Sequence, residues 1–270
     1  MRLFALFFGL MLAACPFAIS VLAPVSAQIE EGEQILVGDV GPGQTFIVSV
    51  EPKVQSGGKY GLGGAYDMLI ATSLPSGWSS SPSKLYSNPL QADITVPVDA
   101  LPGNYLVELT LWDEAGEQGL GKNVSFYINV SVRRDVMDIK VEPPFRFVGA
   151  GQPARYTINI LNKGIANDIF IVGSSGVRNW EFRRSIYIPA GTSKAVDYEL
   201  VGEEESDYQV KIWAKSSSSD AIRSEHEVRL KVHSNLFSDY RAVNKGVLLF
   251  PLTQAPLYFV TGLLSNLLPS

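Results

Sequence analysis

Cysteine and histidine are scarce in this chain. Its 270 residues include one cysteine and two histidines. A single cysteine cannot form a disulfide within the chain, so a disulfide-stapled scaffold and a cysteine-rich zinc site are excluded. Two histidines leave little material for a histidine metal centre or for acid–base catalysis. We therefore expect no metal ligands and no cofactor.

The chain also lacks an excess of basic residues. Its 22 lysines and arginines are outnumbered by 27 aspartates and glutamates, and the net charge is -5. A protein that binds nucleic acid needs a basic face, so nucleic acid is not expected as a partner. The serine-rich stretches are followed by no histidine–aspartate pattern, and no other set of polar residues indicates a catalytic centre. The sequence therefore predicts a protein without catalytic residues that is not an enzyme.

The first 27 residues have the pattern of a secretory signal peptide. Arg2 supplies the positive charge, a long apolar stretch follows, and small residues at 25–27 precede Gln28. Pro24 breaks a helix just before the small residues, which favours cleavage after Ala27. An uncleaved N-terminal anchor is the alternative. We expect the mature chain to lie outside the cytoplasm, to associate with the cell surface, and to begin with an exposed segment at 28–34.

The only cysteine, Cys15, lies inside this apolar stretch. Residues 12–15 read Leu-Ala-Ala-Cys, which resembles the lipobox at which prokaryotic lipoproteins are cleaved and lipidated. Two features oppose lipidation: Pro16 follows directly, and the apolar run continues to Val25, whereas a lipobox cysteine usually opens a polar tether. Cysteine is also a common small apolar residue in such segments. Removal of Cys15 with the signal peptide is the favoured interpretation.

The C-terminal region, residues 234–270, combines a linker with an apolar segment. Residues 246–270 carry no charge, and Pro251 and Pro256 interrupt the segment. After Pro256, apolar residues recur at helical spacing, which predicts a short amphipathic helix. This helix could lie on a membrane, dock on a partner, or fold back on the chain itself. The residues expected to anchor or dock it are Leu257, Val260, Leu264, Leu267 and Leu268.

Between the two ends, apolar and polar residues alternate with a period of two. Even-numbered residues from Val124 to Val132 are apolar, and most odd-numbered ones are polar. Residues 224–233 show the same pattern, and turn clusters rich in glycine and proline separate such runs at short intervals. Many short strands with frequent turns are typical of sandwiches. We predict an all-β fold with two immunoglobulin-like sandwiches, at 35–132 and 133–233.

An internal repeat supports this division. The turn sequence Gly-x-Gly-Gln occurs at 41–44 and again at 149–152, a tryptophan recurs at 78 and 180, and a tyrosine opens a late strand at 105 and 208. The offsets are 108, 102 and 103 residues. This is close to the size of one immunoglobulin-like sandwich, about 100 residues. Each tyrosine also suggests a tyrosine corner, although the usual cysteines are absent.

The second repeat carries a longer pattern that resembles a known family. The pattern is Tyr156-x-Ile158-x-Ile160-x-Asn162-x-Gly164-x-x-Asn167-Asp168-x-Phe170, followed by Trp180 and by Tyr208-x-Val210-x-Ile212. It is similar to the tandem immunoglobulin-like repeats of secreted archaeal and bacterial surface proteins, and to the NPCBM-associated domain that accompanies some glycosidases. The resemblance covers residues 137–233 and is weaker over 35–132. It implies a sandwich of about seven strands and brings no catalytic residues.

Two N-glycosylation sequons stand six residues apart. They begin at Asn123 and Asn129, and on one strand both would lie on the same polar face. In a secreted protein this position suits glycosylation, while chance occurrence of such short triplets is the alternative.

The loop at 56–66 is a candidate recognition surface. It is long and glycine-rich and carries Lys59, Tyr60 and Tyr66, and a passive flexible connection is the alternative. Trp213 points away from the expected core face, which indicates contact with the other sheet, contact with another domain or stacking on a ligand, and contact with another domain is favoured.

These observations lead to two functional hypotheses. The first is a non-enzymatic structural or interaction protein of the cell surface, whose sandwiches display loops while the tail anchors or docks. The second is a carbohydrate-binding accessory module of the cell envelope, which would use loop 56–66 and Trp213. The expected partner is a cell-envelope protein or glycan, with contact to a membrane surface through the C-terminal segment.

Overall fold

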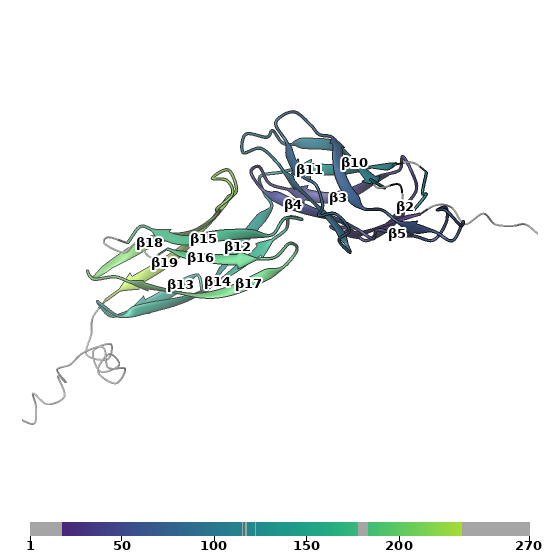
Figure 1. The fold of residues 1–270 in the computed structure, drawn as a ribbon. Coiled ribbons are helices and arrows are strands. Elements are labelled where there is room, and N and C mark those ends of the chain that lie inside the picture. Colours follow the sequence, from purple (N-terminus) through teal and green to yellow (C-terminus); the bar gives the residue numbers. More distant parts are fainter. Residues whose placement is uncertain (1–17, 115, 117, 122, 178–182, 234–270) are drawn as a thin grey trace, which may run out of the picture. The chain divides into compact units, whose positions relative to one another are not determined.

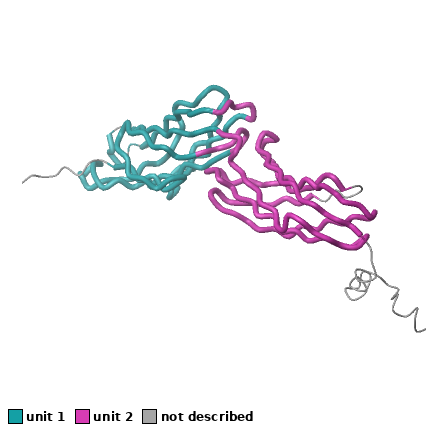
Figure 2. Tube along the Cα trace, turned by 180° about the vertical axis from the view of Figure 1, so that it is seen from behind, with its two compact units in different colours: residues 1–38, 45–97, 103–132 teal, residues 39–44, 98–102, 133–270 magenta. Residues whose placement is uncertain are grey.

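A computed structural model describes residues 18–114, 116, 118–121, 123–177 and 183–233. These residues form nineteen strands, and no helix occurs among them, so the predicted all-β class is confirmed (Figure 1). Contacts along the chain divide it into two compact units (Figure 2). Unit 1 comprises residues 1–38, 45–97 and 103–132, and unit 2 comprises 39–44, 98–102 and 133–270. The main junction therefore falls between Val132 and Arg133.

Unit 1 is a β-sandwich with a small additional hairpin. One sheet has the order β2 (Ala27–Ile29), β1 (Ile19–Ala23), β4 (Thr45–Val50), β9 (Leu90–Thr95) and β8 (Ser79–Ser81). The other has the order β3 (Gln34–Val40), β11 (Val124–Val132), β10 (Gly103–Trp112) and β7 (Met68–Ser73). The hairpin pairs β5 (Lys53–Val54) with β6 (Gly64–Ala65). The even-numbered apolar residues of β11 are all buried, so its period of two places them in the core.

The N-terminal boundary differs from the sequence prediction. The segment expected to be signal peptide up to Ala27 contains β1, whose Ile19 and Val21 are buried in the core of unit 1. Residues 28–34 are exposed as expected except Ile29 of β2, which is buried. β1 is apolar and follows directly on an apolar leader, so composition marks no boundary between them. Residues 1–17 lie outside the described residues.

Unit 2 is a second sandwich. A three-stranded sheet has the order β12 (Met137–Glu142), β14 (Pro153–Asn162) and β17 (Ser193–Val201). A five-stranded sheet has the order β13 (Phe145–Val148), β19 (Arg223–Val232), β18 (Ser206–Ser216), β15 (Asp168–Ser175) and β16 (Arg184–Ile188). β13 pairs with β19 in parallel, and the other strand pairs of unit 2 are antiparallel. Tyr156, Phe170 and Tyr198 are the largest side chains buried in its core.

The repeated sequence motifs form repeated local structures. In both Gly-x-Gly-Gln turns the glutamine N–H donates to the carbonyl of the first glycine, at 3.2 Å for Gln44 and 3.1 Å for Gln152. Trp78 is buried and its ring centroid lies 5.4 Å from that of Tyr105. Tyr208 donates its hydroxyl to the carbonyl of Glu204, four residues upstream, at 2.9 Å, which is the bond expected of a tyrosine corner. Trp180 lies outside the described residues.

The asparagines of the longer pattern hold loops together. The fully buried Asn162 amide donates to the carbonyl oxygens of Ala166, Ile188 and Pro189, and its side-chain oxygen accepts from Gly164 N–H. The pattern that carries the family resemblance is therefore structural, since this amide joins the β14–β15 and β16–β17 connections.

No helix within the described ranges is long and apolar enough to cross a membrane. The predicted C-terminal helix, with its five anchor or docking residues, lies outside these ranges.

Candidate functional site

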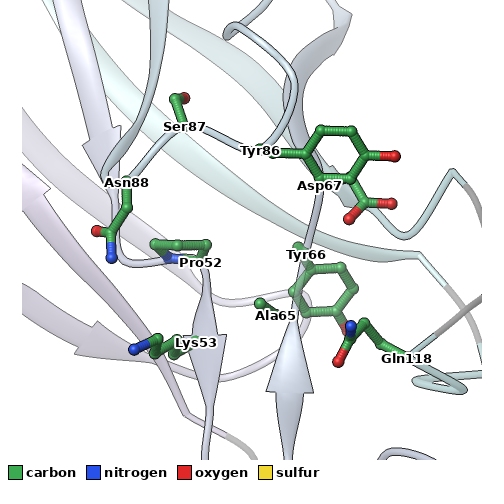
Figure 3. A pocket seen from close by; sticks show the side chains of 9 residues that line it. All are labelled: Pro52, Lys53, Ala65, Tyr66, Asp67, Tyr86, Ser87, Asn88 and Gln118. Carbon is green, nitrogen blue, oxygen red and sulfur yellow. The ribbon is translucent and has the colours of Figure 1, made fainter.

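A cavity of about 380 Å³ opens beside the β5–β6 hairpin of unit 1. Three segments that are distant in the sequence supply its walls: the hairpin, the turn before β9, and the loop between β10 and β11. Figure 3 shows the lining side chains around the end of β6. The lining residues are Pro52, Lys53, Ala65, Tyr66, Asp67, Tyr86, Ser87, Asn88 and Gln118.

Glycines give the loop at 56–66 a defined shape. Gly63 N–H donates to the Gly57 carbonyl at 2.9 Å, which closes the loop, and Lys59 N–H donates to the Gln118 carbonyl at 2.9 Å. A Cβ at Gly63 would lie 2.0 Å from the Val54 carbonyl oxygen, and its φ of +86° also favours glycine. One hydrogen bond thus ties the loop to the β10–β11 connection.

The three candidate residues of this loop have different environments. Lys59 and Tyr60 are exposed, and Tyr60 together with Leu62 shows more than four-fifths of its surface, at 81% and 86%. Tyr66 is 2% exposed and forms part of the cavity wall. Burial raises the pKa of Tyr66 to about 12, and the negative charges of Glu31 and Asp113 add to the shift. The uncharged side chain of Tyr66 therefore forms part of the cavity wall, while the side chain of Tyr60 is exposed and can contact a partner.

Sequence reasoning missed the turn that carries Tyr86. Tyr86 is 69% exposed and, with φ of 58°, is the one non-glycine residue of the described ranges with a positive φ. Tyr86 N–H donates to the Asp67 carbonyl at 2.9 Å, and the Ser87 hydroxyl donates to the Lys84 carbonyl at 2.9 Å. A bulky residue in this conformation is uncommon and is held there by its surroundings. Its signal in the sequence was an aromatic residue within a turn cluster.

The chemistry of the cavity suits a small polar ligand. Lys53 brings a positive charge, Asp67 a carboxylate, and Ser87, Asn88 and Gln118 bring groups that donate and accept hydrogen bonds. The tyrosine rings add flat apolar surface next to these groups. A few polar groups converging beside aromatic rings are typical of a ligand pocket.

Trp213 packs against residues of its own sheet in unit 2. It is half-buried between the buried residues Ile212 and Ala214, and its ring covers Gly173, where a Cβ would lie 2.4 Å from the ring. The guanidinium groups of Arg183 and Arg223 lie 5.9 and 5.4 Å from the ring centroid. The ring therefore stabilises its own sheet face through packing and cation–π contacts, and it does not join the cavity of unit 1.

The two sequons differ in accessibility. Asn123 is exposed just before β11, whereas Asn129 is half-buried within β11. The side-chain oxygen of Asn129 is buried without a hydrogen-bond partner. The structure thus leaves Asn123 as the more accessible acceptor. Cys15 lies outside the described residues, so the lipidation hypothesis is not addressed.

Across the described part of the chain, no three histidine, cysteine, aspartate or glutamate side chains gather as metal ligands would.

The described fold is that of a tandem β-sandwich protein. No protein-family model matches the chain, and no curated protein matches it. Among solved structures, it is similar to the Yersinia pseudotuberculosis adhesin InvE, with 13% identity over 71% of this chain and 56% of that one and a TM-score of 0.26. It is also similar to PapD-like domain 7 of human CEP192, with 8% identity over 38% of this chain and 88% of that one and a TM-score of 0.26. Red sea bream transglutaminase matches with 11% identity over 71% of this chain and 29% of that one, at a TM-score of 0.29.

Proposed function

We propose that this chain is a non-enzymatic interaction protein of the cell surface that displays loops on two immunoglobulin-like sandwiches. One observation carries the proposal: the loop at 56–66 is held in shape by its glycines and presents Tyr60 and Leu62 almost fully to solvent. A rigid loop that exposes an aromatic residue loses little entropy when it binds. The expected signal peptide and C-terminal segment would bring this surface to the cell envelope.

The test measures binding of the purified full chain to envelope preparations of the producing cell. We expect the Tyr60→Ser/Leu62→Ser double variant to bind at least tenfold more weakly. Leu36→Ser is the matched control, because Leu36 is equally apolar and 67% exposed on β3, away from this loop. Equal binding by the loop variant and the wild type would contradict the proposal.

A second candidate function is binding of an envelope carbohydrate, and the cavity of unit 1 favours it. Its amides, hydroxyl and charged groups can pair with sugar hydroxyls, while Tyr86 offers a ring on which a sugar face can stack. Residues 137–233 resemble NPCBM-associated domains, which accompany some glycosidases. In this proposal the second sandwich therefore accompanies the carbohydrate-binding unit and does not itself bind the ligand.

Calorimetry with a panel of soluble oligosaccharides tests the second candidate. Lys53→Ala and Gln118→Ala remove exposed cavity side chains, and each is expected to weaken binding about tenfold. Lys59→Ala is the control, because Lys59 is exposed on the loop but does not line the cavity. If no oligosaccharide binds, or if the control weakens binding as much as the cavity variants, the carbohydrate proposal is wrong.

A further inference from the structure

The strand β1 lies within the N-terminal segment that the sequence assigns to the signal peptide. It is an inner strand of its sheet, because β2 pairs with one edge and β4 with the other. Ile19 pairs with Ile29 of β2, and Val21 pairs with Val50 of β4. The Ser20 carbonyl also accepts from Glu51 N–H at 2.9 Å.

The side chains of β1 alternate as those of a core strand do. Ile19 and Val21 are 1% and 0% exposed, while Leu22 on the opposite face is 43% exposed. Cleavage after Ala27 would remove both buried side chains and the pairing of β1 with β2 and with the Ser49–Val50 end of β4. The backbone groups of β4 would then be left at an open sheet edge, and the core would lose two of its apolar members.

We propose that the mature protein retains β1 and that any removal of the leader ends before Ile19. This proposal concerns processing and does not depend on the proposed function. It divides the long apolar run into two parts with different roles, a leader and a core strand. The apolar run continues to Val25, and this was an argument against cleavage near Cys15. If residues 19–23 form a core strand, their apolar character has a structural reason and no longer opposes cleavage before Ile19.

The direct test is the N-terminus of the secreted protein. The full chain would be exported from a bacterial host, purified, and examined by N-terminal sequencing and intact mass. We expect the first residue at or before Ile19. A folded mature protein that begins at Gln28 would overturn the proposal.

A matched pair of substitutions in the full chain gives a second test. Val21→Ala removes a buried side chain and Leu22→Ala an exposed one, and both keep the segment apolar enough for export. We expect Val21→Ala to lower the Tm of the secreted protein by about 5 °C or more, and Leu22→Ala by less than about 2 °C. If residues 1–27 are removed, both variants yield the same mature protein as the wild type. Identical masses and Tm values for all three proteins would therefore overturn the proposal.

Discussion

Asn162 shows how one buried amide can determine the conformation of two loops. Its side chain is fully buried, and its amide donates to the carbonyl oxygens of Ala166, Ile188 and Pro189 at 2.8, 3.2 and 3.3 Å. Without this amide, the Ala166 and Ile188 carbonyls lose a side-chain donor in a place that water does not reach. A buried polar group left unpaired costs free energy that an exposed one does not.

Asn162→Ala is therefore expected to lower the free energy of unfolding of unit 2 by about 2–4 kcal/mol. Urea denaturation of the full chain measures this change. Asn159→Ala is the matched control, since Asn159 lies on the same strand with an exposed side chain, and its effect should stay within about 0.5 kcal/mol. Equal effects of the two substitutions would show that the Asn162 hydrogen bonds do not stabilise the fold.

Two buried tyrosines should make the protein sensitive to alkali. Burial raises the pKa of Tyr66 and of Tyr156 from 10.0 to about 12. A pKa that is higher in the folded state means that folding favours the neutral phenol. This contribution to stability is complete below pH 10, and it is lost as the pH rises from 10 to about 12.

Phenolate absorbance during an alkaline titration checks this expectation. Tyr66→Phe should remove one of the phenols that titrate late. If Tyr66→Phe leaves the late part of the titration unchanged, Tyr66 is not held neutral by burial.

The strands that the sequence predicted best are those with one face toward the core and one toward solvent. The strands β11 and β19 lie where the alternation placed them, because burial and exposure follow the period of two. In contrast, β1 was missed because an apolar leader precedes it, and β13 was missed because its four residues are too few to establish a period.

Only part of the candidate site could be predicted from the sequence. The loop at 56–66 stands out by its glycines, but the cavity beside it also needs Tyr86 and Gln118, which lie on other connections. Long-range strand pairing brings these segments together, and local residue patterns carry no information on that pairing. The sequence therefore indicated the loop and its exposed residues, whereas the cavity required the fold.

The glycines of this loop lead to a prediction about its folding. Gly63→Ala would place a Cβ 2.0 Å from the Val54 carbonyl oxygen at a φ of +86°, so the β5–β6 hairpin would have to shift. Gly61→Ala is the matched control, because Gly61 also has a positive φ, +71°, but nothing lies within 4 Å of its Cβ position. We expect a loss of about 3 kcal/mol for Gly63→Ala and about 1 kcal/mol for Gly61→Ala, measured by urea denaturation. Similar losses would mean that the loop is free to move away from the hairpin.

The middle of the chain forms two β-sandwiches in succession, one in each unit. Each contains two sheets around one apolar core. The number of sandwiches could be predicted from the sequence because repeated turns recur at the length of one domain. The sequence could not show that unit 1 begins with β1, because this strand has no counterpart in the repeated motifs.

The uncharged C-terminal segment leads to the last prediction, which concerns the whole protein. If this segment anchors the protein to an envelope or docks it there, a chain ending at Lys245 keeps both sandwiches but loses that attachment. Cells expressing the full chain should retain it in the membrane fraction after a high-salt wash, and the shortened chain should be released. A full-length variant with Leu257, Val260 and Leu264 replaced by serine keeps the length of the segment but not its apolar spacing, so it should be released as well. Release of the full chain to the same extent as the shortened one would contradict anchoring.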